Sequence, residues 1–214
     1  WQYSIDGGTT WTTISTNTTT TQNYSNITQT TMYYATVQSG TCPQANSSTV
    51  TITVDSATVG GTVSPSTTVC SGANSGTLTL SGDTGNVLKW QFNTGSGWND
   101  IPLTANTHTC AYSNLTATTM YRAVVQNGSC SSANSSPAVI TVNPGATGGT
   151  LSGGTTVCKI SNSGTIQLSG QVGSVANWDS TTNSGANWYP ISNTATTLFY
   201  NNLDTTTMYR VHVQ

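Results

Sequence analysis

Short runs of alternating apolar and polar residues fill the chain, and no stretch shows the apolar period of a helix. Alternation with period two is typical of a strand that buries one face. In the middle of the chain about seven such runs are separated by turn signals roughly every 8–12 residues, which is the pattern of a β-sandwich. The predicted strands are Gly61–Cys70, Gly76–Leu80, Val87–Phe92, Trp98–Ile101, Thr107–Ser113, Met120–Gln126 and Ala138–Val142.

Alternation also assigns faces within these runs. In Val87–Phe92 it places Leu88, Trp90 and Phe92 on the core side. Pro65 interrupts the first run, which an edge strand tolerates because proline cannot donate to a ladder. We therefore expect one edge strand there.

The pattern recurs along the chain. Met32, Met120 and Met208 follow one another at intervals of 88 residues, each inside a Thr-Thr-Met-Tyr segment. This period is far above the length of a solenoid repeat and matches a small self-sufficient domain.

We predict an all-β chain of tandem Ig-like β-sandwich repeats of about 88 residues. The middle copy, 56–143, is complete; 1–55 is the C-terminal part of one repeat and 144–214 the N-terminal part of another. We expect further copies of the repeat on both sides.

Each repeat has a tryptophan on its third strand and a tyrosine just after a Leu-x-x-x-Thr corner, with Ile27 in place of Leu in the first repeat. The tyrosine is placed where a tyrosine corner ties the chain back through its hydroxyl. We expect these side chains in the cores: Trp1, Trp90, Trp178, Tyr33, Tyr121 and Tyr209.

Charge is sparse, with 5% charged residues, no Glu and a net charge of −2. Four Lys and Arg residues cannot form the basic stripe that a nucleic-acid partner needs. The abundant Thr suits β-structure through its branched Cβ. Regularly placed Trp, Tyr and Val argue against low-complexity disorder.

The cysteines suggest an oxidising compartment. Cys70 and Cys130 have counterparts in the flanking repeats, Cys158 and Cys42, whereas Cys110 has none. We predict a Cys70–Cys130 disulfide that staples one end of the sandwich and indicates an extracytoplasmic location. Cys42 and Cys158 would pair with residues beyond the two ends of the sequence.

Three motif strings carry a family resemblance: ATGGTLSGGTTVC from Ala146, SGTLTLSGDTGNVLKWQ from Ser75 and TTMYRAVVQNGSC from Thr118. They resemble the Ig-like repeats of giant cell-surface adhesins of Bacteroidota, above all the SprB-like gliding-motility adhesins. The resemblance covers essentially the whole chain. It implies export by type IX secretion, display on the outer membrane, and a mobile non-enzymatic filament that grips the substratum.

No arrangement typical of an enzyme is visible. The segment from Ser4 to Trp11 fits the Asp-box of sialidase propellers, but this motif itself stabilises a hairpin turn, and the equivalent turns lack it. The six Asp residues are scattered, whereas glycoside hydrolysis needs a close pair. His108 and His212 have no counterparts in other repeats, so no triad is expected.

We expect no cofactor and no metal site. His108 and Cys110 form only a lone pair on one strand, whereas zinc sites use three or four ligands. Calcium between repeats would need clustered carboxylates, and Asp55 is replaced by Asn143 at the next junction. Cys110 is expected to be a buried thiol.

A second set of aromatic residues stands at the exit of the most variable turn: Trp11, Trp98 and Trp188. They are candidate ligand-facing residues, because an aromatic face can stack on a sugar ring. Packing against the neighbouring strand is the alternative.

Three D-[ST]-[AILMVT] motifs resemble the Bacteroidota O-glycosylation signal, and they make Ser56, Ser180 and Thr205 candidate glycosylation sites. Sugar there would hydrate a surface that lacks charge.

The leading hypothesis is a structural stalk segment of a secreted or outer-membrane-attached surface adhesin, with no membrane span of its own. It rests partly on the expectation that the repeats share no polar constellation. The alternatives are an array of polysaccharide-binding modules and an accessory region of a secreted glycoside hydrolase. Partners would be surface polysaccharide or the substratum, and uncharged Thr-rich edge strands invite lateral self-association.

Overall fold

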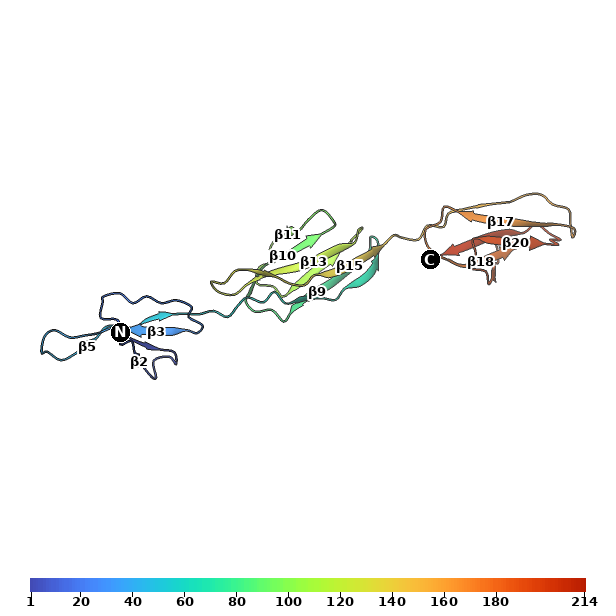
Figure 1. Cartoon of the computed structure of the whole chain (residues 1–214). Coiled ribbons are helices and arrows are strands. Elements are labelled where there is room, and N and C mark those ends of the chain that lie inside the picture. The colour runs from blue at the N-terminus through green and yellow to red at the C-terminus, as the bar shows by residue number, and fades with distance from the viewer. The chain divides into compact units, whose positions relative to one another are not determined.

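The structure is a computed structural model that describes residues 1–214, and all its regular elements are strands. No helix long and apolar enough to cross a membrane is present. The strands of the first repeat, blue in Figure 1, are β1 (Gln2–Ser4), β2 (Thr12–Thr13), β3 (Thr31–Tyr34), β4 (Thr36–Val37), β5 (Ala45–Asn46) and β6 (Val50–Ile52). They form a sheet of order β2-β1-β3-β6 and a separate β4-β5 pair.

The middle repeat contains two facing sheets, which confirms the predicted sandwich. One has the order β11-β10-β13-β15-β8, with β14 added to β13, and the other has the order β12-β9-β7. The strands are β7 (Thr62–Ser64), β8 (Thr67–Cys70), β9 (Ser75–Ser81), β10 (Asn86–Asn93), β11 (Asn99–Ile101), β12 (Thr109–Ser113), β13 (Thr119–Gln126), β14 (Ala133–Asn134) and β15 (Ala138–Asn143).

The third repeat, orange to red in Figure 1, follows the same plan with fewer strands. Its sheets have the orders β16-β17-β20 and β19-β18-β21. The strands are β16 (Thr150–Ser152), β17 (Ser163–Ser169), β18 (Val175–Thr181), β19 (Tyr189–Ile191), β20 (Thr197–Asn201) and β21 (Met208–Val213).

The first predicted strand of the middle repeat is divided between the two sheets. β7 pairs with β9 in antiparallel fashion, whereas β8 pairs with β15 in parallel fashion. Between them lies the cis peptide bond Ser64–Pro65. The expectation of a single edge strand is therefore wrong: proline has no N–H with which to continue a ladder, and the chain changes sheets there.

Large apolar side chains fill the space between the sheets. In the middle repeat Leu78, Trp90, Val125 and Ile140 are completely buried. The core of the third repeat consists of Ile166, Leu168, Val175, Trp178, Leu198 and Tyr200. Because burial of apolar area supplies most of the folding free energy, these residues hold the sheets together.

A β-bulge in β10 corrects one predicted face. The register with β13 shifts between Val87 and Lys89, so Leu88 has no partner on the neighbouring strand. Val87 is buried together with Trp90, and Leu88 is 43% exposed. The prediction that Leu88 faces the core is wrong because a bulge inserts one residue and interrupts alternation.

Each third-strand tryptophan also has its ring N–H satisfied. The Nε1 atom of Trp90 donates to the carbonyl oxygen of Thr107 at 2.8 Å, and that of Trp178 donates to Ala195 at 2.9 Å. Trp1 donates in the same way to Thr19 at 2.9 Å. A buried indole normally has such a partner, so the bond fixes the ring orientation of Trp90 and Trp178, whereas Trp1, which we expected in a core, is only partly buried.

Candidate functional site

A row of polar side chains crosses three strands of the middle repeat, on the face opposite the core. Gln91 of β10 lies opposite Asp100 of β11 and opposite Arg122 of β13. Its amide donates to Asp100 Oδ1 at 2.7 Å, and Arg122 Nε donates to its Oε1 at 2.8 Å. Lys89 Nζ lies 2.8 Å from Asp100 Oδ2. We call Asp100, Gln91 and Arg122 the cross-strand row.

Trp98 covers one end of this row. The guanidinium carbon of Arg122 lies 4.1 Å from the centroid of the Trp98 ring, within the range of a cation–π contact. The ring is half-buried. One of its faces is therefore occupied by a side chain of its own repeat.

The third repeat has the same arrangement with a carboxylate at its centre. Asp179 of β18 lies opposite Arg210 of β21, whose Nε donates to Asp179 Oδ2 at 2.8 Å. Arg210 in turn lies 4.4 Å from the centroid of the Trp188 ring. His212 Nε2 and Asn177 Nδ2 each lie 2.8 Å from an oxygen of Asp179.

In the first repeat the row is uncharged. The hydroxyl of Tyr34 donates to Gln2 Oε1 at 2.7 Å, and the rings of Tyr34 and Trp11 meet edge to face with centroids 4.4 Å apart. The three repeats thus share a tryptophan-capped polar contact across strands. The expectation of no repeated polar constellation is wrong; the signal was the recurrence of Arg122 as Arg210 after 88 residues.

The electrostatics of the rows favour stability rather than reactivity. The hydrogen bond from His212, and then that from Arg210, lower the pKa of Asp179 below its usual range. The amide of Gln91, and then Lys89, lower the pKa of Asp100. A carboxylate held in its ionised form by donors is a poor general acid, and neither carboxylate has a nucleophile among these contacts.

The other candidate chemical groups stand apart. His108 Nε2 lies 3.0 Å from Asp83 Oδ2 at the surface, whereas Cys110 is only 5% exposed. Burial raises the pKa of the Cys110 thiol. No group of three or more His, Cys, Asp or Glu side chains in the structure could hold a metal ion.

The Asp-box segment forms a hydrogen-bonded turn. Asp6 Oδ1 accepts from the amides of Thr9 and Thr10 at 3.1 and 3.0 Å. The Thr10 hydroxyl and amide and the Ser4 hydroxyl lower the Asp6 pKa to about 2. In the third repeat Thr181 and Asn183 occupy the positions of Ser4 and Asp6. The Oδ1 atom of Asn183 accepts from Asn187 N at 2.9 Å, so Asn183 holds its turn as Asp6 does.

The predicted Cys70–Cys130 disulfide is absent, because all five cysteines are free thiols. Cys70 ends β8 in register with Asn143, beside the Leu115 corner that precedes β13. Cys130 follows the far end of β13, after the turn at Asn127. The two cysteines therefore lie toward opposite ends of the middle repeat, and the prediction is corrected accordingly.

An asparagine side chain links two segments at the end of the repeat where we expected the disulfide. Asn74 Nδ2 donates to the carbonyl oxygens of Cys70 and Leu115 at 2.7 and 2.8 Å, and its Oδ1 accepts from Leu115 N at 3.0 Å. Asn162 makes the same contacts with Cys158 and Leu203 at 2.6, 2.8 and 2.9 Å. The recurrence of Asn74 after 88 residues was the available signal.

The tyrosines placed at the corners pair with a second tyrosine from a neighbouring segment. The ring centroids of Tyr121 and Tyr112 are 6.2 Å apart, and those of Tyr209 and Tyr200 are 6.4 Å apart. Tyr33 pairs with Tyr24 at 6.4 Å. The tie-back of the hydroxyls stays a prediction.

The three candidate glycosylation sites differ in access. Thr205 is exposed in the loop between β20 and β21. Ser56 is exposed, but its hydroxyl oxygen accepts from Asn127 Nδ2 at 2.9 Å. Ser180 is half-buried within β18 and paired with Tyr189 and Tyr209. Access therefore favours Thr205.

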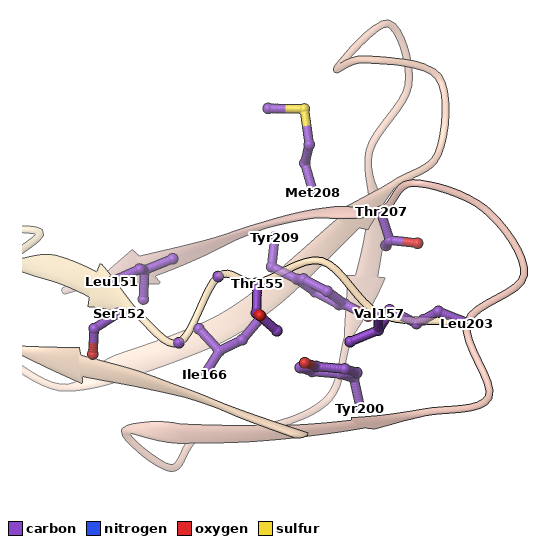
Figure 2. A pocket seen from close by; sticks show the side chains of 12 residues that line it. Leu151, Ser152, Thr155, Val157, Ile166, Tyr200, Leu203, Thr207, Met208 and Tyr209 are labelled. Carbon is purple, nitrogen blue, oxygen red and sulfur yellow. The ribbon is translucent and has the colours of Figure 1, made fainter. Parts of the chain in front are cut away.

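The third repeat contains an open apolar groove of about 270 Å³. Figure 2 shows Leu151, Val157, Ile166, Tyr200 and Tyr209 around this groove. No titratable side chain except those of Tyr200 and Tyr209 lines it. The groove can therefore hold apolar side chains but offers no acid, base or metal ligand.

Comparison with known proteins gives a family and likenesses to solved structures. No curated protein matches the chain. A crystal structure of the chicken CNTN1 FN1–FN3 domains is similar at a TM-score of 0.31 with 15% sequence identity, over 85% of this chain and 68% of that one. One family model, described as a domain of unknown function (DUF8696), matches residues 1–56, 59–144 and 147–214. The chain therefore belongs to the DUF8696 family.

Proposed function

We propose that the chain is a non-enzymatic structural segment of a long secreted or cell-surface adhesin filament. The observation that carries this proposal is the succession of three matches to one family model, 1–56, 59–144 and 147–214. A protein that repeats one sandwich gains length with each copy, and length is what a stalk requires.

The distribution of polar groups supports a structural role. Asp100 and Arg122 of the cross-strand row, and Asp179 and Arg210 of the equivalent arrangement in the third repeat, are each paired within their own repeat. The groove of the third repeat lacks the convergent charged groups of a catalytic site. Gliding motility, type IX secretion and outer-membrane attachment belong to the proposal through the resemblance to SprB-like adhesins.

Surface display is the property to test first. Antibodies against the middle repeat should label intact cells that produce the protein, and brief external protease treatment should remove the label. Deletion of the gene should weaken attachment of those cells to a solid surface. Labelling seen only after cell lysis would contradict the proposal.

Polysaccharide binding is the second candidate, and the half-buried Trp98, Trp11 and Trp188 favour it because they recur at one place in each repeat. One face of Trp98 already contacts Arg122, so a sugar would stack on the remaining ring surface. A glycan array probed with the chain and with its Trp98→Ala variant tests this candidate. Binding that is lost in the variant would favour it over a purely structural stalk.

A further inference from the structure

Cys130 lies against the segment that leads into the middle repeat. Its Sγ atom is 3.9 Å from the carbonyl oxygen of Asp55 and 3.4 Å from that of Ser56. The neighbouring Ser129 N donates to Asp55 Oδ2 at 2.9 Å. Asn127 Nδ2 donates to the Ser56 carbonyl oxygen at 2.8 Å. These bonds hold the turn that carries Cys130 next to the junction residue Asp55.

Cys70 lies beside the next junction residue. Asp55 recurs after 88 residues as Asn143. Cys70 is opposite Asn143 in the parallel ladder of β8 and β15, and Ser71 N donates to the Asn143 carbonyl oxygen at 2.8 Å. The Cys70 side chain is exposed, so it is accessible to a thiol from outside its own repeat.

The chain approaches the two junction residues in the same way. Val54 N, one residue before the first junction, donates to Thr30 Oγ1 at 3.1 Å. Val142 N, one residue before the second, donates to Thr118 Oγ1 at 3.0 Å. The 88-residue period therefore relates the local structures as well as the sequences of the two junctions.

The two cysteines also keep fixed places within a repeat. In the turns of Cys130 and Cys42 alike, the glutamine four residues earlier donates to the cysteine carbonyl oxygen at 2.9 Å. Cys70 and Cys158 accept in the same way from an asparagine four residues later. We call the two positions the turn cysteine and the β8 cysteine of a repeat.

These positions meet at one junction. The turn cysteine of a repeat lies beside the last residue of the preceding repeat, as Cys130 lies beside Asp55. The β8 cysteine lies beside the last residue of its own repeat, as Cys70 lies beside Asn143. At any one junction both cysteines thus adjoin the same residue. Their Cα atoms can therefore come within the about 4.4–6.8 Å that a disulfide spans.

We propose that Cys70 forms a disulfide with the turn cysteine of the repeat that follows its own, so that disulfides join consecutive repeats. The two thiols give up two protons and two electrons to a small-molecule disulfide such as oxidised glutathione, which becomes two thiols. In cells the bond rests on the proposed secretion, because an oxidising compartment supplies the oxidant. The pairing itself depends on the geometry of the junction and is tested in solution.

An extended chain provides the test. Residues Asn127–Asn143 are joined a second time after Gln214, the counterpart of Gln126, which adds a turn cysteine to the third repeat. In a buffer of reduced and oxidised glutathione this chain should lose about 2 Da, the mass of two hydrogen atoms, and link the added cysteine to Cys70. Cys70→Ser should abolish the link, as should serine in place of the added cysteine. Cys42→Ser is the matched control and should retain it.

Peptide mapping distinguishes this link from pairing within the third repeat. Trypsin cuts after Lys89, Arg122, Lys159 and Arg210. Cys70, Cys158 and the added cysteine therefore fall in three different peptides. Cys158 is nearer to the added cysteine along the chain, so loop closure in an unfolded chain favours Cys158. In the folded chain the Cys70 link should be at least about tenfold more abundant than the Cys158 link, and concentrated urea should remove this preference.

Three results would overturn the proposal: a link from the added cysteine to the Cys158 peptide, no link at all, or a Cys70 link that is equally abundant in urea. None of them bears on surface display, which the labelling of intact cells tests separately.

Discussion

Single polar side chains secure the loops of these repeats. Asn74 joins the end of β8 to the corner before β13 by one hydrogen bond to Cys70 and two with Leu115, and Asp6 holds the β1–β2 turn by bonds from its neighbours. Such side chains replace the backbone partners that loop groups lack. At this scale each repeat depends on a few residues that the hydrophobic pattern does not reveal.

Removal of the Asn74 amide should destabilise the middle repeat. Asn74→Ala leaves Leu115 N without its partner and removes one of the two donors to Leu115 O, the other being Gly72 N, which costs about 1–3 kcal/mol of unfolding free energy. Urea unfolding followed by hydrogen exchange of β13 measures the loss. Ser131→Ala, on an exposed loop, is the control and should change nothing.

The Asp6 carboxyl should titrate at about pH 2, where its hydrogen bonds place its pKa. Because the folded pKa lies below the unfolded value of ~3.9, the carboxylate stabilises the turn above about pH 4, and this contribution disappears as the pH falls toward 2. Carbon NMR of the carboxyl group gives the midpoint. Thr10→Val should move it upward, and Thr13→Val should leave it in place.

The cysteines should differ sharply in reactivity. Cys42, Cys70 and Cys158 are exposed, whereas burial shields Cys110 and raises its pKa. Cys110 should react with iodoacetamide on the order of 100-fold more slowly than the exposed thiols. Mass spectrometry of timed samples measures the rates. A Cys70–Cys130 crosslink detected in the native chain would contradict the free thiols of the structure and support the disulfide predicted from the sequence.

At the scale of elements, strand pairing brings together side chains that are distant in sequence. Arg122 reaches Gln91 and Trp98 only because β13 and β10 align Arg122 with Gln91. The same alignment places Arg210 beside Asp179 in the third repeat. The cross-strand row therefore stabilises one register of the sheet against slipped alternatives.

Loss of the guanidinium should loosen the outer face of this sheet. Arg122→Ala removes the cation–π contact and a charge-assisted hydrogen bond, which together contribute about 1–2 kcal/mol at a partly exposed site. Arg122→Lys keeps the charge but not the planar fork, so it should restore only part of that stability. Chemical unfolding followed by deuterium exchange of β10 and β13 measures both. Equal unfolding free energies of the unchanged chain and the two variants would show that the cross-strand row does not stabilise the repeat.

The alternation of Met120–Gln126 and its recurrence after 88 residues were sufficient to predict the sandwich and its repeats, because burial imposes period two on a half-buried strand. The face of Leu88 could not be predicted, since one inserted residue reverses the alternation without a compositional sign. The partners of Gln91 could not be predicted either. They depend on register, which a single strand sequence does not contain.

At the scale of the whole chain, the middle and third repeats each have a core of their own around one buried tryptophan, Trp90 and Trp178. The disulfide prediction failed at this scale. It paired Cys70 with Cys130 because both recur in the flanking repeats, whereas β8 ends beside Asn143 and Cys130 follows the opposite end of β13.

Damage to one core should stay within its repeat. Trp90→Ala removes a fully buried indole and should cost the middle repeat about 3–5 kcal/mol. Deuterium exchange should accelerate in β9, β10 and β13 while β17 and β18 keep their protection. The reciprocal variant Trp178→Ala should produce the opposite pattern. Joint loss of protection in both repeats would show that they unfold as one unit.

The parallel pairing of β8 with β15 has a mechanical consequence. β8 lies near the start of the middle repeat's sequence and β15 near its end. The two strands run side by side, with Thr67 opposite Ile140 and Cys70 opposite Asn143. Tension applied through the two ends would pull them in opposite directions along their length. The bonds between them would then share the load in shear, and all must break nearly together. A chain built from such repeats resists extension until a threshold force, and then lengthens by one repeat at a time.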